Sequence, residues 1–570
     1  MYRFDWIPFL LFIALLLVII PILGRYLANL FQGKKTALHP VLGWLEILCY
    51  RFAGVDPIEE MSWGRYAKAM LFFNLWGFLF LFILQMIQAH LPFNPQHFED
   101  LSWPLAFNTA ISFVTNTNWQ AYAGENTMSY ATQMWGLTVQ NFVSAATGNA
   151  VLFALIRGFL RKQTDKIGNF WSDLVRTIIY LLLPLSLLFS IFLVSQGVTQ
   201  TLSSYTELTT LEGAKQVIPV GPVASQVAIK QIGTNGGGFF NTNSAHPFEN
   251  PTPLSNFLET LAILMIPAAS VYAFGILIDS RKHACILLAI MFAIWLGGFT
   301  IAWDSESMKN PIMEATPYLE GKETRFGVTN SILWATVTTG TSNGSVNAMH
   351  DSLSPLAGGV AMLNIMLGEL VFGGVGVGLC SMIMFVLTTV FLSGLMVGRT
   401  PEYLGKKIEK KDIQWVMIAV LTPSALILIG AGISSVLPEA LSSLTDQGPH
   451  GLSQILYAFT SAAGNNGSAF AGLNANTNYY NIGLGIVMFF ARLAILVPSL
   501  GLAGHLAAKK NVPMSAGTLS TNTFLFAAML FSVILIICAL TFFPALSLGP
   551  IVEQLLMLNR EGFPPLPTTS

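Results

Sequence analysis

The stretch Ser461–Leu473 reads SAAGNNGSAFAGL, and a small polar triplet, Asn465-Asn466-Gly467, lies at its centre. Three similar triplets with Asn in the middle occur earlier in the chain: Thr115-Asn116-Thr117, Thr234-Asn235-Gly236 and Ser342-Asn343-Gly344. Aligned on the central Asn, the copies recur roughly every 110 to 120 residues, which predicts a fold built from four repeated units.

Each triplet follows a segment long enough for about three helical turns. These segments are Ser102–Val114, Pro222–Ile232, Asn330–Thr339 and Leu452–Ala463. A short helix that points its C-terminus at an axis presents the negative end of its dipole there, and the oxygens that follow can replace the water around a cation. A single Asn-Gly run is usually a surface turn, but four copies between long apolar stretches favour a cation filter.

The composition is that of a membrane protein with many spans. Of the 570 residues, 53% are hydrophobic and 10% are charged, whereas soluble domains carry about 25% charged residues. The net charge of −1 argues against a nucleic-acid partner. The four cysteines are scattered, the histidines form no metal-binding motif, and no phosphate-binding G-x-x-x-x-G-K-[ST] loop occurs. We therefore expect no nucleotide on this chain.

Ten apolar segments are near the ~20 residues that cross a bilayer. They are Trp6–Leu23, Ala67–Ile87, Gln133–Ile156, Val175–Val194, Leu254–Ile278, Cys285–Ala302, Leu356–Met396, Gln414–Leu437, Asn481–Leu502 and Asn522–Phe543. The seventh is too long for one crossing, and its glycines, from Gly368 to Gly378, predict a break near its middle. The short apolar stretch His39–Tyr50 is expected to lie along the membrane interface.

Basic residues alternate between the loops, which predicts the topology. Lys and Arg gather in the loops that do not carry a triplet, so those loops are expected inside, and both termini are expected outside with the triplets. We predict an all-α membrane protein with ten transmembrane helices: four helix–pore-loop–helix units around one pore, and one extra helix at each end. The expected units are residues 1–30; 64–157, with pore loop 102–120; 174–280, with pore loop 222–241; 284–397, with pore loop 330–352; 413–504, with pore loop 452–473; and 520–548.

Backbone carbonyls are the expected main ligands, with the hydroxyls of Thr115, Thr234 and Ser342 as further candidates. Oxygen ligands without a ring of carboxylates favour a monovalent cation, K⁺ or Na⁺. The Asn side chains have two interpretations: they face the ion, or they hydrogen-bond behind the filter and hold its loops.

Two charges, Glu369 and Arg492, fall inside apolar spans, where each costs about 2.5–3.5 kcal/mol. They are expected either to form a structural ion pair or to line an ion route. Arg399, Lys406 and Lys407 are expected at the inner surface, in contact with anionic lipids or as a docking surface for a partner.

Five stretches closely resemble the A subunit of the bacterial Kdp potassium-transporting ATPase. They are Phe107–Gln120 (FNTAISFVTNTNWQ), Gly233–Asn241 (GTNGGGFFN), Ala348–Ser352 (AMHDS), Gly398–Lys407 (GRTPEYLGKK) and Ser461–Leu473. The resemblance implies that the family's K⁺ filter maps onto the four triplets, including Gly236, Gly344 and Gly467. It also implies that Glu369 and Arg492 resemble residues along an ion route between subunits.

The same resemblance implies a non-catalytic, K⁺-binding subunit of an uptake complex in the bacterial inner membrane. Its implied partners are a P-type ATPase B subunit that hydrolyses ATP, a C subunit and a small single-span subunit. One alternative is a self-sufficient K⁺ or Na⁺ channel or symporter of the same superfamily. A second is a membrane-embedded transferase, for which His350-Asp351 is the nearest catalytic candidate.

Overall fold

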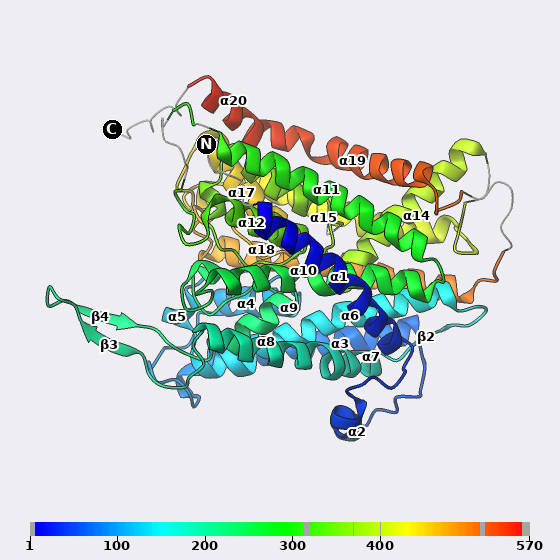
Figure 1. Ribbon diagram of the computed structural model, residues 1–570, viewed down its shortest axis with the longest axis horizontal. Coiled ribbons are helices and arrows are strands. Elements are labelled where there is room, and N and C mark those ends of the chain that lie inside the picture. Colours follow the sequence, from blue (N-terminus) through cyan, green and yellow to red (C-terminus); the bar gives the residue numbers. More distant parts are fainter. Residues whose placement is uncertain are drawn as a thin grey trace.

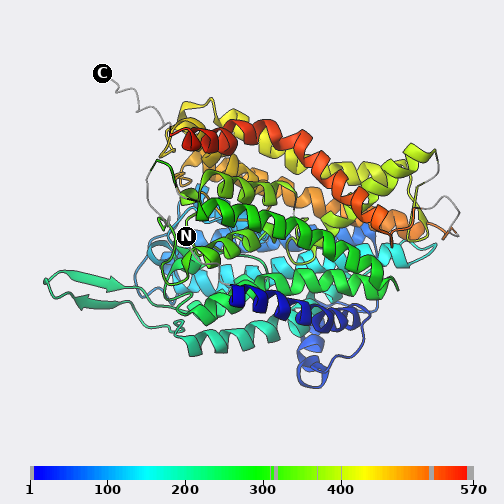
Figure 2. The ribbon, with the colours of Figure 1, turned by 45° about the horizontal axis from the view of Figure 1, so that its top comes forward.

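The computed structural model describes residues 6–308, 310–312, 319–368, 370–398, 401–512 and 519–560. Long helices run side by side through the molecule (Figure 1; Figure 2). Ten helices in this part of the chain are long and apolar enough to cross a membrane, which confirms the ten predicted spans. They contain α1 (Trp6–Phe31), α3 (Trp63–Met86), α6 (Val139–Leu160), α8 (Leu183–Gln196), α10 (Pro253–Leu277), α11 (Arg281–Ser307), α14 (Val377–Val397), α15 (Lys410–Ser434), α18 (Asn478–Ala508) and α19 (Phe524–Leu546).

Three of these spans are extended by adjoining helical turns. The first is η2 (Thr132–Thr138), which leads into α6; α7 (Phe170–Thr177) and η3 (Ile178–Leu182) lead into α8; η6 (Ser547–Ile551) and α20 (Val552–Leu558) follow α19. Most residues of α6, α10, α14 and α18 are buried, whereas α1, α3, α15 and α19 are largely exposed. The second helix of each predicted unit therefore lies inside the bundle, and the exposed helices carry apolar side chains suited to lipid.

The four predicted short helices are present. They are α4 (Trp103–Val114), α9 (Val223–Ile232), α12 (Gly327–Gly340) and α17 (Gly448–Ala463), and their side chains are mostly buried. Each packs between long helices: α4 against α3 and α18, α9 against α8 and α10, α12 against α10 and α11, and α17 against α15 and α18. This packing fixes the direction in which each short helix ends.

The seventh predicted span is interrupted, as its glycines indicate. Helix α13 (Pro355–Met366) stops inside the bundle, and α14 begins only at Val377. Gly368, Gly373 and Gly376 have φ angles of 78°, 65° and 79° in the intervening segment. An irregular backbone at membrane depth requires partners within the protein, because lipid supplies none.

Shorter elements cap the two ends of the bundle. The apolar stretch near the N-terminus forms α2 (His39–Ala53), which lies off the bundle in Figure 1. A hairpin of β3 (Thr206–Thr209) and β4 (Lys215–Ile218) projects from the end at which α1 begins (Figure 1). The remaining elements are β1 (Met61–Ser62) with β2 (Lys166–Gly168), β5 (Glu402–Tyr403) with β6 (Lys406–Lys407), η1 (Gln88–His90), α5 (Gly124–Thr127), η4 (Asn243–Ala245), η5 (His350–Ser352) and α16 (Pro438–Leu441).

Lys406 does not lie on the surface, contrary to the sequence-based expectation. Its side chain is fully buried, and Nζ donates hydrogen bonds to the carbonyl oxygens of Arg161 (2.6 Å) and Lys509 (3.0 Å). Lys406 therefore ties three segments at this end of the bundle together, because a buried ammonium group must satisfy its donors. Lys407 is exposed, and Arg399 lies outside the described residues.

Candidate functional site

The C-terminal ends of the four short helices converge, so segments more than a hundred residues apart meet. The first and second triplets are joined by Asn116, whose Nδ2 donates to the Thr234 carbonyl oxygen at 3.0 Å. The second and third are joined by the Gly344 N–H, which donates to the Asn235 carbonyl oxygen at 3.3 Å. The C-terminal dipoles of these helices thus face a common region, which favours a cation.

The same kind of contact completes the ring. Ser342 Oγ donates to the Gly464 carbonyl oxygen at 2.8 Å and joins the third loop to the fourth. Asn465 Nδ2 donates to Thr117 Oγ1 at 2.9 Å and joins the fourth to the first. The four loops therefore form a closed ring in chain order.

The glycines of the ring allow neighbouring backbones to touch. A Cβ added to Gly236 would overlap the Gly344 backbone, and one added to Gly467 would overlap the Thr117 carbonyl oxygen. Both glycines have a φ of 95°, which residues with a Cβ rarely adopt. A Cβ at Gly344 would lie 2.9 Å from the Asn466 carbonyl oxygen.

Backbone geometry shifts the predicted register of the first loop by one residue. In every loop one N–H bonds to the carbonyl five residues earlier, and the residue before it has a positive φ. The bonded pairs are Thr117–Ser112, Asn235–Lys230, Asn343–Thr338 and Asn466–Ser461, and the positive-φ residues are Asn116, Thr234, Ser342 and Asn465. Alignment on the central Asn was therefore wrong for the first copy, whose equivalent triplet is Asn116-Thr117-Asn118, with Thr115 one position outside it.

Asn118 is the residue that the sequence-based alignment missed. It takes the place of the glycines, with a φ of 57°, and lines an open cavity of about 670 Å³ outside the ring. Its buried amide has no hydrogen-bond partner among the described residues. A buried amide of this kind is available to a ligand that enters from the cavity. The shared pattern of N–H to carbonyl bonds in the four loops, which is invisible in the sequence, identifies it.

The Asn side chains of the triplets hold the loops from behind. Asn116 Oδ1 accepts hydrogen bonds from Ser144 Oγ (2.8 Å) and Asn235 Nδ2 (2.6 Å). Asn343 Nδ2 donates to the Lys230 carbonyl oxygen at 3.1 Å, and Asn466 Nδ2 donates to the Thr338 carbonyl oxygen at 2.9 Å. Of the two interpretations left open by the sequence, these contacts favour the bracing one.

The candidate hydroxyl ligands are also engaged with the protein. Thr234 Oγ1 donates to the Gly233 carbonyl oxygen (2.8 Å) and accepts from the Val375 N–H (2.9 Å). Thr115 Oγ1 contacts Thr117 Oγ1 at 2.7 Å. Backbone carbonyls of the loops also accept hydrogen bonds, at Thr234, Asn235 and Gly236. A carbonyl oxygen has a second lone pair, however, so the carbonyls stay the better candidates for coordinating an ion.

The break in the seventh span lies against the ring. Besides the bond from Val375 to Thr234, the Gly373 N–H donates to the carbonyl oxygen of Gly340, the last residue of α12. A Cβ at Gly376 would overlap Gly148 on α6. Arg492, on α18, is buried beside Gly148, since a Cβ there would lie 3.4 Å from its Nη2. Glu369 lies outside the described residues.

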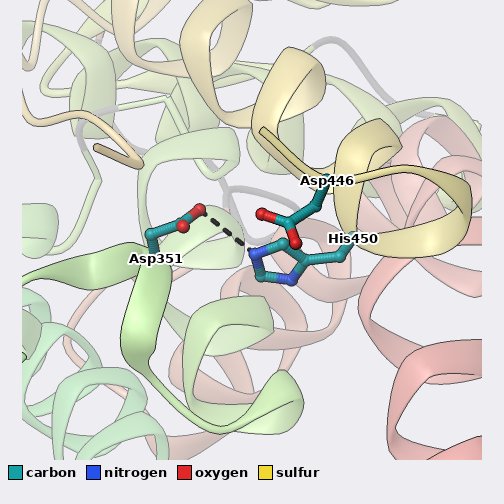
Figure 3. Close-up of side chains that lie close together, drawn as sticks. All are labelled: Asp351, Asp446 and His450. Atoms are coloured by element: carbon teal, nitrogen blue, oxygen red, sulfur yellow. Dashed lines mark hydrogen bonds and ion pairs between the residues drawn. The ribbon is translucent and has the colours of Figure 1, made fainter. Parts of the chain in front are cut away.

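His350 and Asp351, the nearest candidates for a catalytic pair, bond to different residues: His350 to Tyr457 and Asp351 to His450. His450 Nε2 lies 3.1 Å from Asp351 Oδ1, and its Nδ1 lies 2.7 Å from Glu553 Oε1. Figure 3 shows Asp351 facing His450, with Asp446 next to the imidazole. Burial lowers the pKa of His450, but hydrogen bonds to the two carboxylates outweigh it and raise the pKa to about 10. The cluster therefore joins α17 to α20 as a protonated-histidine ion pair.

His350 connects the outer cavity to the fourth loop. Its Nδ1 is 2.8 Å from the Tyr457 hydroxyl, which is 2.8 Å from Ser468 Oγ, and Ser468 in turn bonds Asn466. Burial lowers the pKa of His350 to about 4. The imidazole is therefore neutral at physiological pH.

We expect acid to destabilise the protein through His350. Its folded-state pKa, about 4, is below the ordinary value of about 6.5, so the unfolded chain binds more protons in that window and stability falls as the pH falls from 6.5 to 4. The full loss, once the pH is well below 4, is about 3–4 kcal/mol. Thermal unfolding of His350→Gln, which keeps a hydrogen-bonding group but does not titrate, should show a smaller decline in this window. An equal decline in the variant would contradict the assignment.

Four short helices that end in one ring, held between ten spanning helices, define the class: a membrane protein of the four-pore-loop cation-transporter fold. A crystal structure of the potassium transporter TrkH from Vibrio parahaemolyticus shares this fold, with a TM-score of 0.51 at 14% identity over 84% of this chain and 97% of that one. The family model described as potassium-transporting ATPase A subunit matches residues 10–555. The chain belongs to that family.

Relatives match over nearly their full length. A protein of Rhodospirillum centenum named potassium-transporting ATPase potassium-binding subunit is 53% identical, over 98% of each chain. A protein of Leptospira interrogans with the same name is 52% identical, over 98% of this chain and all of the relative. A Pseudomonas putida relative, also so named, is 52% identical over 97% of this chain.

Proposed function

We propose that this chain is the K⁺-binding and translocating subunit of an ATP-driven potassium uptake complex. The observation that carries the proposal is the closed ring of four loops at the C-terminal ends of buried helices, in a chain of the potassium-transporting ATPase A subunit family. K⁺ enters from the outer cavity, and carbonyl oxygens of the triplets replace its water. Asn118 adds an amide oxygen at the cavity side.

The filter consists of the triplets and the register-shifted Asn118. It is framed by the expected pore loops 102–120, 222–241, 330–352 and 452–473 of the four repeat units. The loops and both termini face the outside of a bacterial inner membrane, which the basic residues of the opposite loops support. Beyond the ring, the ion passes the break in the seventh span, where Arg492 lines the route or locks the helices. The same two roles are expected of Glu369, which lies outside the described residues.

ATP hydrolysis takes place on a separate P-type ATPase subunit. A C subunit and a small single-span subunit complete the complex, as the resemblance of the motifs implies. The exposed Lys407 contacts that ATPase or anionic lipids at the inner surface, and the same role is expected of Arg399, which lies outside the described residues. The burial of Lys406 removes it from such a surface. This division of labour agrees with a sequence that carries no phosphate-binding loop.

The test is K⁺-dependent activity of the purified, assembled complex. ATP hydrolysis and ⁸⁶Rb⁺ or K⁺ uptake into vesicles should rise with external K⁺ at low concentration and should not respond to Na⁺. The same vesicles with this chain alone should show no ATP-dependent uptake. Uptake by the chain alone without an ATPase would instead support a self-sufficient channel, and a complex that does not respond to K⁺ would refute the proposal.

A further inference from the structure

Lys230 is a charged residue buried behind the second loop. It lies on α9, one turn before the ring, and its side chain is 0% exposed. Nζ forms an ion pair with Glu249, which is also 0% exposed, and donates to Asn243 Oδ1 at 2.8 Å. Burying an ammonium group is costly even when it is paired, so we expect Lys230 to do more than fill space.

Asn243 links Lys230 to the ring through hydrogen bonds to both. Its Nδ2 donates to the Gly236 carbonyl oxygen at 2.8 Å, while its Oδ1 accepts from Lys230. Because the ammonium group can only donate, it fixes which amide atom of Asn243 faces it and therefore which atom faces Gly236. Asn243 itself has a φ of 55°, a conformation that asparagine tolerates.

Glu249 holds the other side of the same loop. Its Oε1 accepts from the Phe240 N–H at 2.9 Å, and a Cβ at Gly238 would lie 2.6 Å from that oxygen. The ion pair therefore clamps the segment that leaves the second triplet at two points. The backbone carbonyl oxygen of Lys230 also accepts from the N–H groups of Asn235 (2.9 Å) and Gly236 (3.1 Å).

We infer that Lys230 is a positioning residue for ion selection: through Asn243 it sets the direction of the Gly236 carbonyl, with Glu249 as its buried counter-ion. This inference rests on the proposed function and deepens it. An alternative is purely electrostatic, in which the ammonium group only weakens cation binding by repulsion. The two accounts predict opposite changes in the KM for K⁺ when Lys230 alone is replaced by an uncharged residue that cannot donate.

Two variants of the assembled complex separate these accounts. Lys230→Met removes the donor and the positive charge and leaves Glu249 negatively charged. Lys230→Met combined with Glu249→Gln also removes the carboxylate charge, so that no unpaired charge is left buried in the fold. We expect both to raise the KM for K⁺ about tenfold and to change the ratio of KM for K⁺ and Rb⁺, with kcat within about twofold. A lower KM in the single variant would establish the electrostatic account and overturn ours.

Lys406→Met is the matched control, because Lys406 is equally buried but bonds only carbonyls at the far end of the bundle. It should lower the unfolding temperature without moving either KM. If the wild-type complex responds to K⁺ and the folded double variant keeps the wild-type KM for K⁺ and the wild-type ratio of KM for K⁺ and Rb⁺, the inference is overturned. A wild-type complex without a K⁺ response would instead refute the proposed function.

Discussion

Gly236→Ala is expected to weaken K⁺ affinity by roughly 100-fold. The substitution forces a residue with a Cβ to a φ of 95° and drives that Cβ into the Gly344 backbone. A left-handed conformation costs about 1–2 kcal/mol, and overpacking adds about 1–3 kcal/mol; about 3 kcal/mol of misplacement in the ring corresponds to roughly 100-fold in affinity. The measurement is K⁺ binding by the assembled complex, with Rb⁺ and Na⁺ as competitors.

Gly197→Ala is the matched control for backbone strain. Gly197 ends α8 in the same repeat with a φ of 105°, but a Cβ there would meet no atom within 4 Å. This variant should lose stability and keep wild-type K⁺ affinity. If Gly236→Ala also keeps wild-type affinity and selectivity, the second loop does not belong to the ion site.

The fold could be predicted from the sequence because the membrane restricts the choice. A span needs about 20 apolar residues with internally satisfied backbone groups, so apolar run length and the placement of Lys and Arg predicted the ten helices. The break before α14 was likewise evident from glycines, since Gly368, Gly373 and Gly376 supply the positive φ angles that end one helix and start another.

The details of the ring could not be predicted from the sequence. Asn116 and Asn118 flank Thr117, so the sequence allows two alignments of the first loop. Only the N–H to carbonyl bonds show that Asn118, not Thr117, matches the glycines of the other loops. Lys230 and Glu249 lie on opposite sides of the second triplet in the sequence, and no motif links them. They pair only because the chain after the second triplet folds back onto α9. Lys406 lies in a run of basic residues that is typical of an exposed loop. In the fold, however, its ammonium group is buried and donates to backbone carbonyl oxygens instead of to water.

The ring packs against the break in the seventh span. We therefore expect transport to be sensitive to a methyl group added in the break, as well as to one added in the ring. The Val375 N–H bonds Thr234 in the second loop, and the next residue, Gly376, presses against Gly148 on α6 with a φ of 79°. Thus α6, the break and the ring cannot shift independently.

Gly376→Ala is therefore expected to lower turnover at least tenfold, because the new Cβ would overlap the Gly148 carbonyl oxygen and displace the segment that packs against the ring. Gly148→Ala places a methyl group at the same contact from the other side, against the Val375 carbonyl oxygen, and should act alike. Gly368→Ala, at a φ of 78° with no atom within 4 Å of its Cβ, isolates strain from contact and should retain more turnover. The measurement is kcat and KM for K⁺ in the assembled complex; wild-type kcat in both contact variants would show that the ion does not depend on this segment.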